Sequence, residues 1–182
     1  MDCCTLRPLP CVSATKDLLS TLKCKLESVS HRYCMFVTLT YAPAFLPQAG
    51  FFDLTAEDGK VTRHLINVTS RCGGHLDLGI VHTSDSQIDM LQSKVQSEYM
   101  PYLCKKDLQL FMKRLRKNLK TNEKIRYYAV GEYGPVHFRP HFHILLWYDS
   151  QSTQQAMGEA ICKSWQFGRI DYQLSKGDAT SY

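Results

Sequence analysis

The chain has 182 residues and a mass of 20.9 kDa, a size that suits one domain with at most short appendages. Its 44% hydrophobic and 21% charged residues are ordinary for a soluble protein with a buried core. The strongest apolar run, Phe142 to Tyr148, is far shorter than the roughly 20 residues of a membrane helix. The first residues also lack the basic-then-apolar layout of a secretion signal. We therefore expect neither a membrane protein, nor a disordered tail, nor a secreted miniprotein.

The positive charge is concentrated in one segment. Residues 105–126 hold nine of the 22 Lys and Arg residues but two of the 17 acidic residues, a net charge of +7 against +5 for the whole chain. A local basic patch is typical of a protein that binds a polyanion. A solvated helix face explains the same charges equally simply.

The eight cysteines are scattered, and no two have the Cys-x-x-Cys spacing of a zinc ribbon. Because the chain shows no secretion signal, their even number does not indicate disulfides. We expect reduced thiols that mostly pack in the interior. They are Cys3, Cys4, Cys11, Cys24, Cys34, Cys72, Cys104 and Cys162.

The first third of the chain predicts one helix and one strand. Apolar residues near helical spacing predict a helix over Ala14 to Val29. The β-branched and aromatic run from Cys34 to Tyr41 predicts a strand that ends before Pro43. The following segment, about 42–100, is rich in turn formers and is expected to be a mostly irregular insertion, with a short hairpin near 60–68.

The clearest predicted helix is Cys104 to Lys120. Its apolar residues fall on one stripe, and its basic residues fall on other faces. The apolar stripe is formed by Leu108, Phe111, Met112, Leu115 and Leu119.

The last third of the chain alternates strands and helices. The predicted elements are strands over 125–132, 141–148 and 168–174, a helix over 153–165, and a new helix after Ser175. Together with the earlier elements, this order predicts an α+β fold, in which an antiparallel sheet has helices packed on one face.

A possible metal site lies in the last third. Residues two apart in a strand point to the same side, so His141 and His143 project from one face of their strand. The turn at Gly134-Pro135 returns the chain, so that Glu132 on the preceding strand could complete a triad. Two histidines and one carboxylate can hold a divalent ion that keeps open positions for a phosphoryl oxygen.

Other polar residues have weaker signals. Thr38 and Thr40 share one strand face and could support the metal ligands, although β propensity explains each threonine taken alone. Most tyrosines lie in predicted strands and suit packing, whereas Tyr182 follows the start of a predicted helix and ends the chain. A phenol has a pKa near 10, so Tyr182 could act as a nucleophile only if it were positioned and activated.

Four segments in order resemble rolling-circle replication initiators of the HUH endonuclease superfamily. Phe36 to Tyr41 resembles the first motif of that superfamily, and Arg139 to Leu146 resembles its His-hydrophobic-His metal motif. Asp107 to Lys117 and Gly131 to Gly134 resemble the version in small single-stranded DNA phages, the Microviridae of the gokushovirus type, including those that infect Chlamydia. The resemblance runs from about Tyr33 to Tyr182.

The resemblance implies a fold, a domain division and a reaction. It implies a ferredoxin-like sandwich related to RNA-recognition domains, with an N-terminal helical segment at 1–32 and the endonuclease domain at 33–182. Family members nick one DNA strand at an origin through a tyrosine, keep a 5′-phosphotyrosine link, free a 3′-OH for a host polymerase, and later rejoin the strand. Tyr182 would be that nucleophile, and Glu132, His141 and His143 would hold Mg²⁺ or Mn²⁺.

The same resemblance implies DNA-binding residues, partners and a location. Single-stranded or origin DNA is the expected substrate, in the cytoplasm of a bacterial host. No phosphate-binding loop occurs in the sequence, so a helicase would be a separate host protein. The expected phosphate contacts are Lys105, Lys106, Lys113, Arg114, Arg116, Lys117, Lys120 and Arg139.

The sequence also departs from the phage pattern. The family's third motif resembles Tyr-Val-Ala-x-Tyr-Val followed by lysine, whereas here Ala179-Thr180-Ser181-Tyr182 matches its opening and then the sequence stops. The Cys-rich pattern of relatives is not recognisable before Tyr33. We therefore expect a chain truncated at the nucleophile helix, and both an active enzyme and an inactive copy remain open.

Two other functions fit parts of the sequence. A non-catalytic domain that binds single-stranded nucleic acid could stack bases on Tyr127, Tyr128 and Phe138, although the glycine-aromatic ribonucleoprotein signature is missing. A small zinc hydrolase would need a more closed ligand set, and no His-Glu-x-x-His helix occurs.

Overall fold

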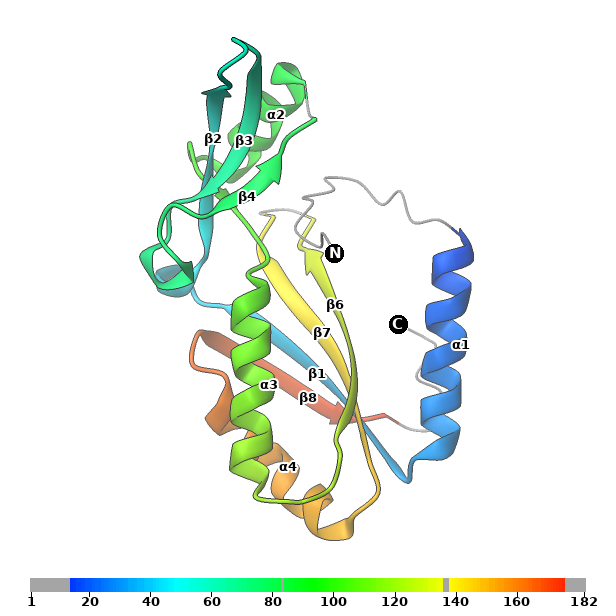
Figure 1. Ribbon diagram of the computed structural model, residues 1–182. Coiled ribbons are helices and arrows are strands. Elements are labelled where there is room, and N and C mark those ends of the chain that lie inside the picture. Colours follow the sequence, from blue (N-terminus) through cyan, green and yellow to red (C-terminus); the bar gives the residue numbers. More distant parts are fainter. Residues whose placement is uncertain (1–13, 83, 136–137, 176–182) are drawn as a thin grey trace.

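The computed structural model describes residues 14–82, 84–135 and 138–175 (Figure 1). Its main sheet is four-stranded and antiparallel, with the strand order β6-β7-β1-β8. The α+β class expected from the sequence is confirmed. The strands of this sheet are β1 (Tyr33–Tyr41), β6 (Arg126–Tyr133), β7 (Pro140–Tyr148) and β8 (Gly168–Leu174).

One face of the main sheet is covered by α3 (Lys105–Leu119) and α4 (Gln151–Ser164). Alternation along the strands sends Val37 and Leu39 of β1, with Phe142 and Ile144 of β7, to this face, where all four are buried. The apolar stripe of α3 meets them, as the sequence predicted, although Leu108 is only partly buried. The main core therefore separates these two helices from the opposite face of the sheet.

The opposite face is partly covered by α1 (Ala14–Ser30). Cys24 packs against Leu145 and Trp147, and the indole Nε1 of Trp147 donates a hydrogen bond to Ser28 Oγ at 3.1 Å. The apolar residues that indicated this helix in the sequence do not face the sheet. Leu19, Leu22, Leu26 and Val29 are all exposed.

The segment expected to be irregular is ordered, and that expectation was wrong. It forms a second four-stranded antiparallel sheet with the order β4-β3-β2-β5, together with one helix and two short 3₁₀ turns. Tight turns account for its turn-rich sequence, because Gly59 and Gly73 both have positive φ angles at connections. The elements are η1 (Pro43–Phe45), β2 (Gln48–Thr55), β3 (Val61–Asn67), η2 (Ser70–Cys72), β4 (Asp77–Ile80), α2 (Asp85–Val95) and β5 (Met100–Pro101).

A buried polar network joins the second sheet to the main one. Asp107 in the first turn of α3 is buried, and both of its oxygens accept hydrogen bonds from Arg71 Nη1 of η2 at 2.7 Å. The hydroxyl of Tyr41, at the end of β1, donates to the same carboxylate at 2.9 Å. Three elements that are distant in sequence therefore meet at one carboxylate.

No helix in the described ranges is long and apolar enough to cross a membrane. The helix predicted after Ser175 falls on residues 176–182, which lie outside the described residues.

Gly168 allows β8 to approach β1. A Cβ atom at this position would lie 2.2 Å from the carbonyl oxygen of Thr40 and 2.3 Å from the nitrogen of Ala42, both in rigid backbone. We expect Gly168→Ala to lower the free energy of unfolding by about 1–3 kcal/mol, as overpacking does elsewhere. Urea unfolding midpoints would measure the change.

Gly134→Ala is the matched control, because its Cβ would meet only ordinary contacts, the nearest at 3.7 Å. Equal unfolding midpoints for the two variants would contradict this explanation of how β8 packs.

Candidate metal centre

The register of the main sheet aligns polar residues in two rows on the face opposite α3 and α4. In antiparallel strands, directly paired residues point to the same side. The first row runs Glu132, His141, Thr40, Arg169, and the second runs Val130, His143, Thr38, Asp171. Each row takes one residue from each of β6, β7, β1 and β8.

The predicted triad meets at one end of these rows. Glu132 Oε2 lies 3.7 Å from His141 Nε2 and 3.2 Å from His143 Nε2. One ligand atom from each of the three side chains falls within 4.8 Å of the others. The imidazoles are nearly perpendicular, at 88°, and Glu132 is 57% exposed, so the group opens to solvent on one side.

Hydrogen bonds orient both imidazoles toward Glu132. The Nδ1 of His141 lies 3.2 Å from the carbonyl oxygen of Arg139, which can only accept, so this nitrogen carries the proton. The Nδ1 of His143 lies 3.1 Å from Thr38 Oγ1. In both cases the Nε2 lone pair is left facing the carboxylate, the arrangement that partners beyond the ligands impose in metal sites.

The electrostatics of His143 also suit ligation. Burial lowers the pKa of His143, and the nearby His141 lowers it further, while Glu132 raises it. The ring of Phe36 stacks on that of His143, with centroids 5.4 Å apart and planes 13° apart. A lowered pKa keeps the imidazole neutral near pH 7, and only the neutral form can bind a metal.

The donor set fits a divalent cation with open coordination positions. Two imidazoles and one carboxylate leave room for water and for oxygens of a substrate. Mg²⁺ prefers oxygen ligands, whereas Mn²⁺ accepts imidazole more readily, so of the two expected ions the donors favour Mn²⁺.

A second group of possible ligands is less suited to catalysis. Cys72, Cys104 and Asp107 lie within the same 4.8 Å limit, but all three are buried, and Asp107 already accepts from Arg71 and Tyr41. A hydrogen bond from Cys104 lowers the pKa of the Cys72 thiol. A substrate would not reach this group. Its two thiols are 32 positions apart in the numbering, which is why no cysteine motif indicated that they meet.

The basic helix does not border the triad. Since α3 packs on the other face, the main sheet lies between its charges and Glu132. Arg114 is half-buried over the ring of Phe167, and Arg116 lies over Tyr127, with centroid distances of 5.6 and 5.7 Å. The other basic residues predicted on this helix are exposed: Lys105, Lys106, Lys113, Lys117 and Lys120.

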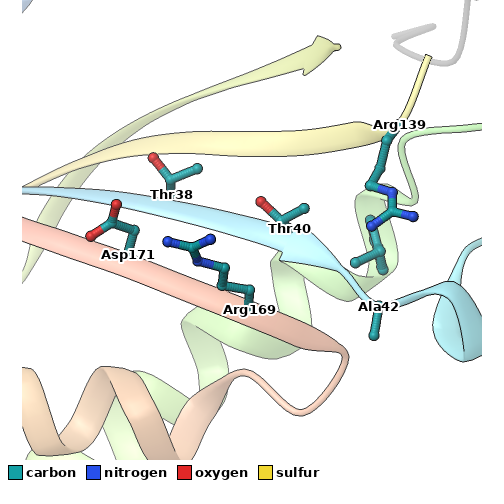
Figure 2. A pocket seen from close by; sticks show the side chains of 7 residues that line it. Thr38, Thr40, Ala42, Arg139, Arg169 and Asp171 are labelled. Atoms are coloured by element: carbon teal, nitrogen blue, oxygen red, sulfur yellow. The ribbon is translucent and has the colours of Figure 1, made fainter. Parts of the chain in front are cut away.

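Arg139, in contrast, lies on the triad's side of the sheet. It lines a pocket of about 380 Å³ beside β1, together with Thr38, Thr40, Tyr41, Ala42, Arg169 and Asp171 (Figure 2). Arg169 and Asp171 were missed in the sequence. Their period-two spacing in the strand predicted over 168–174 was a signal, but their partner strand was unknown. Tyr182, the predicted nucleophile, lies outside the described residues.

Comparison with known families adds a function to this geometry. Residues 94–182 match the family model of the replication-associated protein ORF2. The match covers just under half of the chain and includes Glu132, His141 and His143. Similarity to a replication-associated family supports a role in DNA replication and an interaction with DNA. Searches of curated proteins and of solved structures gave no match.

Thr38 provides a test of how the imidazole is held. Thr38→Val keeps the shape of the side chain but removes the hydroxyl beside His143 Nδ1. Loss of such a partner typically costs 10–100-fold in metal affinity, so we expect Mn²⁺ to bind about 10-fold or more weakly. Thr62→Val, on the second sheet, is the control. Unchanged Mn²⁺ affinity in Thr38→Val, measured by calorimetry, would show that the hydroxyl does not support the site.

Proposed function

We propose that the chain is a metal-dependent endonuclease that nicks and rejoins single-stranded DNA to initiate rolling-circle replication. The observation that carries the proposal is the convergence of Glu132 Oε2 with the Nε2 atoms of His141 and His143 on an open sheet face. The family match over residues 94–182 supports the replication role. The ordered motifs favour the HUH superfamily and the phage initiators of the gokushovirus type.

Glu132, His141 and His143 would hold Mn²⁺ or Mg²⁺. When bound, such an ion supplies Lewis-acid stabilisation of negative charge on a phosphoryl oxygen. The hydrogen bonds to Arg139 and Thr38 keep the two imidazoles in the orientation that ligation needs. The sheet supplies rigid positions for all three ligands, because they lie on two directly paired strands.

Tyr182 is proposed as the nucleophile. Its phenolic oxygen would attack the phosphorus of one phosphodiester while the bond from phosphorus to the 3′ oxygen breaks. The phenol gives up its proton to solvent or a base, and the departing 3′ oxygen takes one up. The products are a 5′-phosphotyrosine and a free 3′-OH, which a host polymerase could extend with a host helicase opening the duplex. Attack by a 3′-OH on the phosphotyrosine reverses the step and joins the strand.

The test is covalent capture of DNA. The protein is incubated with Mn²⁺ and a random-sequence library of single-stranded oligonucleotides labelled at the 3′ end, and adducts that survive denaturation are isolated and sequenced. We expect an adduct that enriches one sequence, is absent with chelator, and is absent in Tyr182→Phe. An adduct that persists in Tyr182→Phe would overturn the assignment of the nucleophile, and cleavage that persists with chelator would overturn the metal-dependent mechanism.

The alternative of a non-catalytic nucleic-acid-binding domain has one supporting observation. Tyr128 and Val130 of the edge strand β6 are exposed, at 37% and 44%, on the face that carries the triad. However, adjacent residues of a strand point to opposite faces, so Tyr127 and Tyr128 cannot form one stacking platform. DNA affinity that survives chelation, with no adduct from any library, would favour this alternative.

A further inference from the structure

We propose that the pocket between β7, β1 and β8 is a second phosphate subsite, in which Thr40, Arg139 and Arg169 bind the DNA backbone next to the phosphodiester at the triad. The inference rests on the proposed function for the identity of its ligand, a phosphodiester of single-stranded DNA. Its evidence is the sheet register and the charges that line the pocket.

The register puts the subsite one strand away from the triad. Thr40 is paired with His141 on one side and with Arg169 on the other, so the three side chains form consecutive steps of one row. Directly paired residues have Cβ atoms about 4.5–5.5 Å apart. Arg139 precedes β7 and approaches the same pocket from the other strand, while its carbonyl oxygen accepts from His141. A DNA strand that crosses the sheet along this row would meet the triad and the pocket in succession.

The chemistry of the pocket suits a phosphate. Figure 2 shows the guanidinium of Arg169 beside β1, near Thr40, with Arg139 reaching in from the start of β7. A guanidinium donates two parallel hydrogen bonds to phosphate oxygens, and a threonine hydroxyl can add a third.

Both arginines are available for a ligand. Other arginines already have carboxylate partners, as Arg63 has Asp53, Arg71 has Asp107 and Arg126 has Glu27. Neither Arg139 nor Arg169 forms an ion pair within the described parts of the chain, and both are exposed. Two unpaired guanidinium groups on opposite walls of one pocket are arranged to hold an anion between them.

Asp171 gives the pocket a polarity. It is paired with Thr38 in the second row, so a carboxylate closes that end of the pocket while the arginines stand at the first row. A phosphate is therefore repelled from the Thr38 end and attracted to the Thr40 end. This arrangement predicts opposite effects for the two charges: removing Arg169 weakens DNA binding, and removing the charge of Asp171 strengthens it.

The experiment measures binding without cleavage. A fluorescent dT20 oligonucleotide is titrated with the whole chain in excess chelator, across a series of salt concentrations. Each phosphate contact to single-stranded DNA contributes a slope of about 0.7 in log affinity against log salt, which corresponds to about fivefold at 0.1 M salt relative to 1 M. We expect Arg139→Ala and Arg169→Ala each to lose about fivefold in affinity and about 0.7 in slope. Arg169→Lys should retain most of the slope, and Asp171→Asn should bind more tightly than the unsubstituted chain.

Arg116→Ala is the matched control, because it removes the same charge from α3 on the other face of the sheet. Thermal unfolding of each variant confirms that the fold is kept. The inference is overturned if the unsubstituted chain does not bind dT20, if Arg116→Ala loses as much affinity as Arg169→Ala, or if Asp171→Asn binds more weakly. Loss of binding in both pocket variants supports the subsite even if no DNA is ever cleaved. Cleavage by a chain whose binding is indifferent to both arginines rejects the subsite and leaves the nuclease proposal standing.

Discussion

Replacing His143 with alanine is expected to reduce Mn²⁺-dependent DNA cleavage by more than about 100-fold, the upper end of the cost of losing a partner that only supports a metal ligand. His143 is the better enclosed ligand, since its Nε2 lies 3.2 Å from Glu132 and its Nδ1 lies 3.1 Å from Thr38. Its removal leaves one imidazole and one exposed carboxylate, too few donors to hold an ion against water. Single-turnover cleavage of a captured sequence would measure the loss.

The control for this variant is His75→Ala. His75 is exposed and lies in the connection between η2 and β4, on the second sheet. The two substitutions remove the same side chain, so a general effect of losing an imidazole would appear in both. Equal cleavage by His143→Ala and His75→Ala would place the reaction elsewhere on the molecule.

Replacing Arg71 with methionine is expected to destabilise the fold by about 3–5 kcal/mol, the usual cost of breaking a buried ion pair from one side. The carboxylate of Asp107 is 3% exposed, and Arg71 Nη1 contacts both of its oxygens. Without the guanidinium, a buried negative charge keeps only the hydrogen bond from Tyr41. Chemical unfolding at neutral pH would measure the change.

Two further variants separate the buried pair from ordinary surface charge. Arg63→Met breaks an exposed pair with Asp53 and should cost less than about 1 kcal/mol. The double variant Arg71→Met with Asp107→Leu removes both charges and should recover most of the lost stability. A double variant less stable than Arg71→Met alone would show that the network acts by something other than charge burial.

The local pattern of the sequence was sufficient for the triad. Alternation placed His141 and His143 on one strand face, and the turn at Gly134-Pro135 returned Glu132 to the same side. These relations involve neighbouring strands joined by a short connection, so period and turn chemistry determine them. The hydrogen bond between Thr38 and His143 required the additional guess that β1 pairs with β7, which the register confirms.

Long-range pairing was not accessible in the same way. Arg169 and Asp171 join the site because β8 pairs with β1, more than 120 positions away in the numbering, and no local signal specifies that partner. The second sheet was mistaken for an irregular insertion because its strands are short and its turns are rich in glycine. The basic helix was associated with the metal site through charge alone, whereas its apolar stripe fixed it to the other face.

Titration of the chelator-treated chain with Mn²⁺, followed by electron paramagnetic resonance, tests the metal centre without DNA or turnover. We expect one Mn²⁺ to bind per chain through Glu132, His141 and His143, with binding lost in Glu132→Gln and in His141→Ala and retained in Cys72→Ser. A chain that binds no Mn²⁺, or that binds it equally well after both substitutions in the triad, would contradict the proposed metal centre.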